Sequence, residues 1–210
     1  MSEPAANFDP LMNRLAGRSA TIGIIGLGYV GLPLALASLD AGYRVLGFDI
    51  SEKRVAAIAS AQQVISYIGA DVMQAAVNSG RFEATTAFDR LAEADAILIC
   101  VPTPITRNRD PDLSFVSDTA EVIAKTLRPG QLVVLESTTW PGTTREVVQP
   151  ILEATGLKVG SDVFLAFSPE REDPGNAKFN TKTIPKVVGA DDPLSRALAV
   201  KLYEQVISQV

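Results

Sequence analysis

The sequence predicts an α/β fold with a doubly wound parallel sheet of Rossmann type. Short apolar segments alternate with segments of helical character along most of the 210 residues. The apolar segments, such as AILICV at 96–101, are hydrophobic at consecutive positions. That pattern is typical of strands covered on both faces, as in parallel sheets. A glycine-rich turn follows the first of these segments, so the observations together favour parallel strands joined by helices.

Six strands and six intervening helices are expected between residues 21 and 168. The strands suit a sheet of order 3-2-1-4-5-6, in which the first half of the chain forms one side and the second half the other. We expect strands at 21–25, 43–50, 82–86, 96–101, 131–138 and 162–168, and helices at 32–42, 52–61, 69–80, 87–95, 115–127 and 143–156.

The composition limits the kinds of partner that the chain can have. It is 47% hydrophobic, and 24 acidic residues against 19 basic ones give a net charge of −5. An acidic chain is a poor candidate for binding nucleic acid or an anionic membrane surface. No apolar stretch reaches the roughly 20 residues that span a bilayer. We therefore expect neither a nucleic-acid nor a membrane partner.

Cysteine and histidine usage narrows the chemistry further. The single cysteine, Cys100, cannot form an internal disulfide, and the first 20 residues lack the apolar centre of a signal peptide. These features predict a cytoplasmic location. Because the chain has no histidine, a Cys/His metal site is excluded and we expect no metal. Acid–base work then falls to carboxylates, Lys, Tyr or water.

The turn after the first strand has the pattern of a dinucleotide cradle. Gly26, Gly28 and Gly31 form G-x-G-x-x-G between a predicted strand and a predicted helix, and Asp49 ends the second strand. The glycines allow a tight turn, close approach of the backbone to a pyrophosphate and close packing of helix and strand. The helix N-terminus adds free N–H groups and positive potential. A glycine turn without a nucleotide is the alternative.

Asp49 favours NAD over NADP as the cofactor. Its carboxylate is placed to accept hydrogen bonds from the adenosine ribose and to repel a 2′-phosphate. Lys53 and Arg54 could instead bind a 2′-phosphate, although both lie on the polar side of the predicted helix. We therefore expect NAD.

Three further strand ends carry unusual sequence. Residues 102–114 begin PTPIT, residues 137–144 read STTWPGTT, and residues 168–176 read SPEREDPGN. Ligands of doubly wound sheets bind outside the carboxyl ends of the strands, so these loops should converge on one crevice. For Glu170 the alternative is a solvated loop carboxylate, and for Trp140 it is a packing anchor rather than a stacking platform. Cys100 is expected only to pack as a neutral thiol.

Four motifs, in order, resemble those of the UDP-glucose/GDP-mannose dehydrogenase family, the nucleotide-sugar 6-dehydrogenases. They are IGLGYVGLPLA, CVPTP, ESTTWPGTT and FSPEREDPGN, and the resemblance extends over about residues 18–210. The SPEREDPGN form, with SYI at 66–68, looks closest to the branch that acts on UDP-N-acetyl-hexosamines. The resemblance implies oxidation of the sugar C6 alcohol to the carboxylate with two NAD molecules.

The resemblance also implies roles for single residues. Tyr29 and Val30 join the glycines at the pyrophosphate, and Asp49 and Arg54 lie at the adenosine ribose. Thr103 and Thr138 line the cofactor near the reacting centre, where Thr138 is also expected to be catalytic. Glu170 is expected to handle the catalytic water or proton.

The family also uses a cysteine nucleophile in a glycine-rich motif that this sequence does not contain, and Cys100 does not match it. The resemblance therefore implies that the 210 residues bind NAD but do not turn over a UDP-sugar alone, and that the full-length protein is a homodimer or larger. The expected organisation is a short or loose helical lead at 1–20, an NAD-binding domain at 21–190 and the start of a central helix at 191–210.

The end of the chain is predicted from local signals. Residues 184–190 (IPKVVGA) are expected to add an edge strand. Asp191, Asp192 and Pro193 form a good helix start, and no Gly, Asn or Pro stops that helix before the last residue.

Two other functions stay open: a β-hydroxyacid dehydrogenase of related fold, and a non-catalytic NAD-binding module.

Overall fold

The computed structural model describes residues 6–105, 111–169 and 185–210. Its centre is one sheet of six parallel strands in the order β3-β2-β1-β4-β5-β6, which confirms the predicted fold class and strand order. The strands are β1 (Thr21–Ile25), β2 (Arg44–Phe48), β3 (Phe82–Thr85), β4 (Ala96–Ile99), β5 (Leu132–Leu135) and β6 (Phe164–Phe167).

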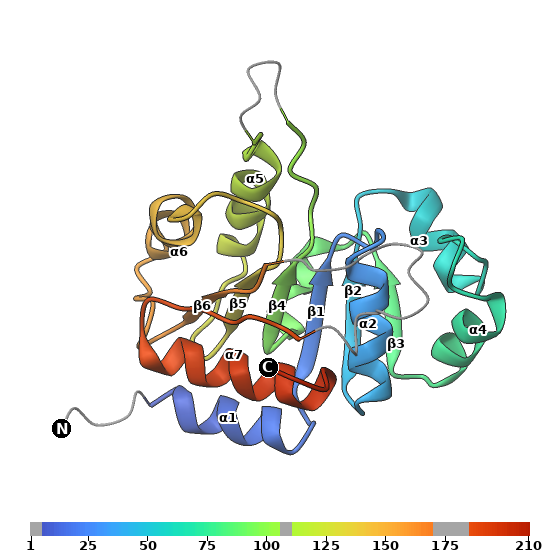
Figure 1. Ribbon diagram of the computed structural model, residues 1–210, viewed down its shortest axis with the longest axis horizontal. Coiled ribbons are helices and arrows are strands. Elements are labelled where there is room, and N and C mark those ends of the chain that lie inside the picture. The colour runs from blue at the N-terminus through green and yellow to red at the C-terminus, as the bar shows by residue number, and fades with distance from the viewer. Residues whose placement is uncertain (1–5, 106–110, 170–184) are drawn as a thin grey trace.

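Helices cover both faces of the sheet (Figure 1). Alternate strand residues pack on opposite faces, which gives two separate apolar clusters. The larger cluster packs under α1, α2 and α7, and the smaller one under α5 and α6; α3 and α4 lie toward the β3 edge. The helices are α1 (Phe8–Ala16), α2 (Gly31–Asp40), α3 (Glu52–Ala59), α4 (Ala70–Asn78), α5 (Ser114–Ala124), α6 (Gln149–Glu153) and α7 (Pro193–Val206).

Several predicted helix boundaries are confirmed by their hydrogen bonds. The Ser51 hydroxyl accepts from the Arg54 N–H at the start of α3, and Asp192 accepts from the Ser195 N–H at the start of α7. Gly42 follows α2 with φ of +107°, a conformation that glycine adopts most readily. The N-terminal lead is a short helix, α1, which lies beside α7 with Leu11 and Leu15 fully buried (Figure 1).

Two predicted helices have different local geometry. The segment expected at 87–95 is a 3₁₀ helix, Phe88–Glu93, a geometry that is common in short pieces. The helix expected at 143–156 begins as a π-helix, Thr144–Val148, and becomes α-helical only in α6. Pro150 has no N–H to donate to the Glu146 carbonyl, so the regular ladder cannot form there.

Two expectations for the C-terminal part were wrong. Among residues 185–190, no edge strand forms: Gly189 makes only an isolated antiparallel bridge with Phe167. Helix α7 ends at Val206 instead of running to the last residue. Ile207 turns to an extended conformation with its side chain buried, and the Gln209 carbonyl accepts from the Lys186 N–H at 2.9 Å. Burial of Ile207 and this bond therefore end the helix without a stop residue.

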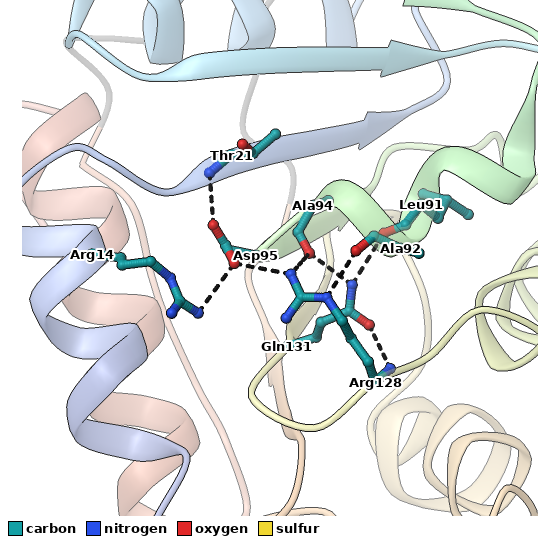
Figure 2. Close-up of polar contacts among 8 residues, drawn as sticks. All are labelled: Arg14, Thr21, Leu91, Ala92, Ala94, Asp95, Arg128 and Gln131. Atoms are coloured by element: carbon teal, nitrogen blue, oxygen red, sulfur yellow. Dashed lines mark hydrogen bonds and ion pairs between the residues drawn. The ribbon is translucent and has the colours of Figure 1, made fainter.

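Asp95 holds the amino end of the sheet together (Figure 2). Its carboxylate accepts from the Thr21 N–H at 3.0 Å and forms ion pairs with Arg14 at 3.1 Å and Arg128 at 3.0 Å. The Gln131 side-chain amide donates to the carbonyl of Ala94, the residue before Asp95, at 2.7 Å. Helix α1, strand β1 and the entrance to β5 are thereby fixed at the end of the sheet opposite the predicted crevice.

Candidate functional site

The glycine turn between β1 and α2 is built on two close backbone approaches. Gly26 has φ of +93°, and a Cβ there would lie 2.6 Å from the Cys100 carbonyl oxygen. A Cβ on Gly31 would lie 1.9 Å from the Gly26 carbonyl oxygen. Both contacts are with backbone, which cannot move aside as a flexible side chain can. The sharp bend that starts α2 therefore requires glycine at both positions.

The N-terminus of α2 is open for an anion. Its N-cap residue is Val30, no side chain caps the helix, and the first turn contains no acidic residue. A helix N-terminus carries partial positive charge and exposes N–H groups that have no helical acceptor. In this first turn the Leu32 N–H already donates to the Gly28 carbonyl and Pro33 has no N–H, so an anion would be bound by the N–H groups that precede them. At Gly28, a Cβ would meet only the Arg54 guanidinium, at 3.6 Å. Space is therefore left above Gly28, where the predicted pyrophosphate would approach.

Asp49 connects the second strand to this turn. One carboxylate oxygen accepts from the Leu27 N–H at 3.0 Å, and the other accepts from the Ser51 N–H at 2.9 Å. The Arg54 guanidinium lies 3.6 Å from the carboxylate and is partly exposed, whereas Asp49 is 8% exposed. The carboxylate thus holds the glycine turn in addition to any contact with a ligand.

The loops after β4 and β5 are joined directly. The Thr103 hydroxyl donates to the Thr138 carbonyl at 2.7 Å, and the Ser137 hydroxyl donates to the Val101 carbonyl at 2.6 Å. The structure therefore brings Thr103 and Thr138 together at the carboxyl ends of neighbouring strands, with the Thr138 side chain exposed. Glu170, the predicted carboxylate of the third loop, lies outside the described residues. Trp140 is 41% exposed, so it is only partly packed.

A polar row lies beneath these loops on the face covered by α7. Leu98, Val134 and Ala166 are aligned across β4, β5 and β6. Two residues further along each strand, Cys100, Glu136 and Ser168 continue this alignment, and all three are buried. These three residues begin or immediately precede the three loops, so their packing fixes where each loop leaves the sheet.

Glu136 is the charged centre of this row. It is fully buried, and its carboxylate lies 2.5 Å from the Lys186 ammonium and accepts a hydrogen bond from the Tyr203 hydroxyl. The Lys186 ammonium also lies 5.6 Å from the centre of the Tyr203 ring. Burial, and next the charge of Glu136, raise the pKa of the Tyr203 hydroxyl well above its ordinary value. Tyr203 therefore stays a neutral donor to the carboxylate.

Glu136, Lys186 and Tyr203 were not predicted from the sequence to form a cluster. One signal was available: Glu136 is an acid at the end of an otherwise apolar strand. A buried carboxylate requires a cation or several donors. Its partners, however, come from separate segments that local patterns do not connect.

A cavity of about 200 Å³ lies along the outer edge of β6, lined by Thr144, Phe167 and Asp191 among others, and is separate from the glycine turn.

Over residues 6–105, 111–169 and 185–210, no helix has the length and apolar character to cross a bilayer. Over the same ranges, no cluster of three acidic, Cys or His side chains is placed to hold a metal.

Known proteins are similar to this chain in both sequence and fold. A UDP-N-acetyl-D-glucosamine 6-dehydrogenase of Pseudomonas aeruginosa is 34% identical over 189 residues, covering 89% of this chain and 44% of that protein. A UDP-N-acetyl-D-mannosamine dehydrogenase of Escherichia coli K12 is 36% identical over 193 residues, covering 88% and 45%. The chain thus spans less than half the length of these relatives.

The structural comparison agrees. The crystal structure of an NDP-N-acetyl-D-galactosaminuronic acid dehydrogenase from Methanosarcina mazei superimposes with a TM-score of 0.83 at 34% identity, covering 93% of this chain and 44% of that one. Residues 20–207 match the sequence profile of the UDP-glucose/GDP-mannose dehydrogenase family, NAD binding domain. The chain therefore belongs to this family and corresponds to its NAD binding domain.

Proposed function

We propose that the turn between β1 and α2 holds the pyrophosphate of NAD, with Gly26, Gly28, Tyr29, Val30 and Gly31 as its contacts. The observation that carries this assignment is the bend itself. Gly31 packs so closely on Gly26 that only glycine fits, and the bend leaves an uncapped helix N-terminus above an open Gly28. An uncapped N-terminus of this kind suits an anionic group.

The remaining contacts follow from the positions of the strand ends. Asp49 and Arg54 flank the turn and are proposed to contact the adenosine ribose. Thr103 and Thr138, joined by a hydrogen bond at the ends of β4 and β5, are proposed to lie toward the nicotinamide. When bound, NAD would supply the hydride acceptor that the side chains of this chain lack.

We propose that the whole protein is an NAD-dependent 6-dehydrogenase that acts on a UDP-N-acetyl-hexosamine. The support is the function named for the relatives from P. aeruginosa and E. coli. Oxidising the C6 alcohol removes a hydride and the hydroxyl proton, and oxidising the resulting aldehyde adds water and removes a second hydride and further protons. Glu170 and Thr138 are proposed to serve the proton transfers, since the chain has no histidine.

The same proposal assigns a limited role to these 210 residues. Residues 21–190 are proposed to form the cofactor domain, with 1–20 as a lead and 191–210, of which Pro193–Val206 are helical, as the start of the connection to the rest of the protein. Cys100 directly follows β4 and is 9% exposed, so it is proposed to pack and not to attack an aldehyde. NADH should bind without turnover of any UDP-sugar. Cytoplasmic location and a whole protein that is a homodimer or larger homo-oligomer stay predictions.

The match of residues 20–207 to the dehydrogenase family disfavours the β-hydroxyacid alternative.

An NADH fluorescence titration of two matched glycine variants tests the cofactor site. Gly31→Ala should lose most NADH affinity, because its methyl group would overlap the Gly26 carbonyl. Gly189→Ala, where a Cβ meets nothing within 4 Å, should bind as the wild type does. Equal affinity of both variants and wild type would refute the proposed site.

A further inference from the structure

The turn that leads into α2 lacks one of the backbone hydrogen bonds that join residues four apart. The Leu32 N–H donates to the Gly28 carbonyl at 3.0 Å, and the Leu34 N–H donates to the Val30 carbonyl at 3.3 Å. The Tyr29 carbonyl lies between these two acceptors, and its partner four residues on would be Pro33. Proline has no N–H, so the helix cannot satisfy this carbonyl.

Tyr67 supplies the missing donor. Its hydroxyl donates to the Tyr29 carbonyl at 2.9 Å. Tyr67 belongs to the segment between α3 and α4, which is anchored on both sides of it. The Gln63 amide donates to the Ser66 carbonyl at 2.9 Å, and Ile68 is 7% exposed within the larger apolar cluster. The donor is therefore held in place by a segment outside the glycine turn.

This bond controls the orientation of a group that faces the cofactor site. The Tyr29 carbonyl and the Val30 N–H belong to the same peptide unit, which is planar and trans, so the two point in opposite directions. Fixing the carbonyl therefore also fixes the direction of the Val30 N–H. Val30 is the N-cap residue of α2, and its N–H lies in the turn to which the pyrophosphate is assigned.

We infer that Tyr67 is a positioning residue for the dinucleotide: by binding the carbonyl that Pro33 leaves without a helical donor, it aims the Val30 N–H at the pyrophosphate. This inference rests on the proposed NAD site. It accounts for a tyrosine, rather than a purely apolar residue, at the 42% exposed position 67. In this role the Tyr67 hydroxyl acts on the ligand through the Tyr29–Val30 peptide.

A double-mutant cycle with Pro33 tests this route. Tyr67→Phe removes only the hydroxyl and should weaken NADH binding by about threefold to tenfold, the usual effect of one hydrogen bond. Pro33→Ala restores an N–H four residues after Tyr29. In that background, Tyr67→Phe should change the NADH dissociation constant by less than about twofold. Affinities are measured by fluorescence titration, and folding is checked by thermal melting.

Tyr43→Phe is the matched control. The Tyr43 hydroxyl also donates to a backbone carbonyl, that of Leu15 at 2.8 Å, far from the glycine turn. This variant should lower the melting temperature and leave the NADH affinity unchanged. The inference is overturned if Tyr67→Phe binds NADH as tightly as the wild type, or if its effect is equally large in the Pro33→Ala background. Failure of the wild type to bind NADH would instead refute the cofactor site itself.

Discussion

The Lys186 ammonium lies 2.5 Å from the Glu136 carboxylate in the protein interior, directly beneath the loops that carry the candidate site. Glu136 follows β5, and Lys186 lies in the segment that returns along β6 toward α7. The pair, together with Tyr203 of α7, therefore connects the start of the Ser137–Thr138 loop to a helix on the covering layer. This arrangement makes the loop geometry depend on the packing of α7.

Lys186→Met should destabilise the chain strongly. The substitution keeps the apolar stem but leaves the buried Glu136 carboxylate with one cation fewer. Breaking a buried pair by removing one partner costs about 3 to 5 kcal/mol, which urea denaturation measures. Lys201→Met, at a surface ion pair with Glu204, is the control and should cost less than about 1 kcal/mol. An equal loss of unfolding free energy in the two variants would show that the buried pair stabilises the chain no more than a surface pair does.

Tyr43 should make stability fall at alkaline pH. Burial raises the pKa of its hydroxyl from 10.0 to about 12, against a smaller lowering effect of Arg18. Below pH 10 the hydroxyl is neutral in both states, so its full contribution is present. Between pH 10 and 12 the unfolded chain ionises first, and stability falls by up to about 1.4 kcal/mol per pH unit.

Urea denaturation of wild type and Tyr43→Phe at pH 9 and pH 11 measures this effect. The phenylalanine variant has no proton to lose at this position, so the stability advantage of wild type over the variant should shrink at pH 11. A difference that is the same at both pH values would contradict the assignment to Tyr43.

Asp49→Ala should affect both cofactor preference and the glycine turn. The carboxylate repels a 2′-phosphate, so its removal should reduce the discrimination against NADPH. It also accepts from the N–H groups of Leu27 and Ser51, so NADH affinity should fall about tenfold as these donors lose their acceptor. Competitive titration with NADH and NADPH measures both effects. Asp118→Ala on the exposed surface of α5 is the control. Unchanged preference in Asp49→Ala would show that Asp49 does not face the ribose.

The parts of the site that local sequence determines were predicted. The glycine spacing dictates a bend that only Gly26 and Gly31 permit, and an acid at the end of the second strand was expected beside it. The strand order followed from the alternation of apolar and helical segments. The helix starts after Ser51 and Asp192 were equally local, because each of these side chains bonds a backbone N–H three residues away.

The parts that depend on contacts between distant segments were missed. Glu136 is separated by 50 residues from Lys186 and by 67 from Tyr203, and Tyr67 by 38 from Tyr29. No periodicity connects such positions, since only the folded sheet and its covering helices bring them together. The end of α7 was misjudged for the same reason: the buried Ile207 and the bond to Lys186, not a stop residue, terminate it.

Calorimetric titration of the chain with NADH and with NADPH tests most directly whether a dinucleotide is held by the backbone where β1 turns into α2. NADH should give heat from binding to a single site, and NADPH should give weaker or undetectable heat because of Asp49. Absence of heat from both cofactors, or binding that survives Gly31→Ala undiminished, would contradict it.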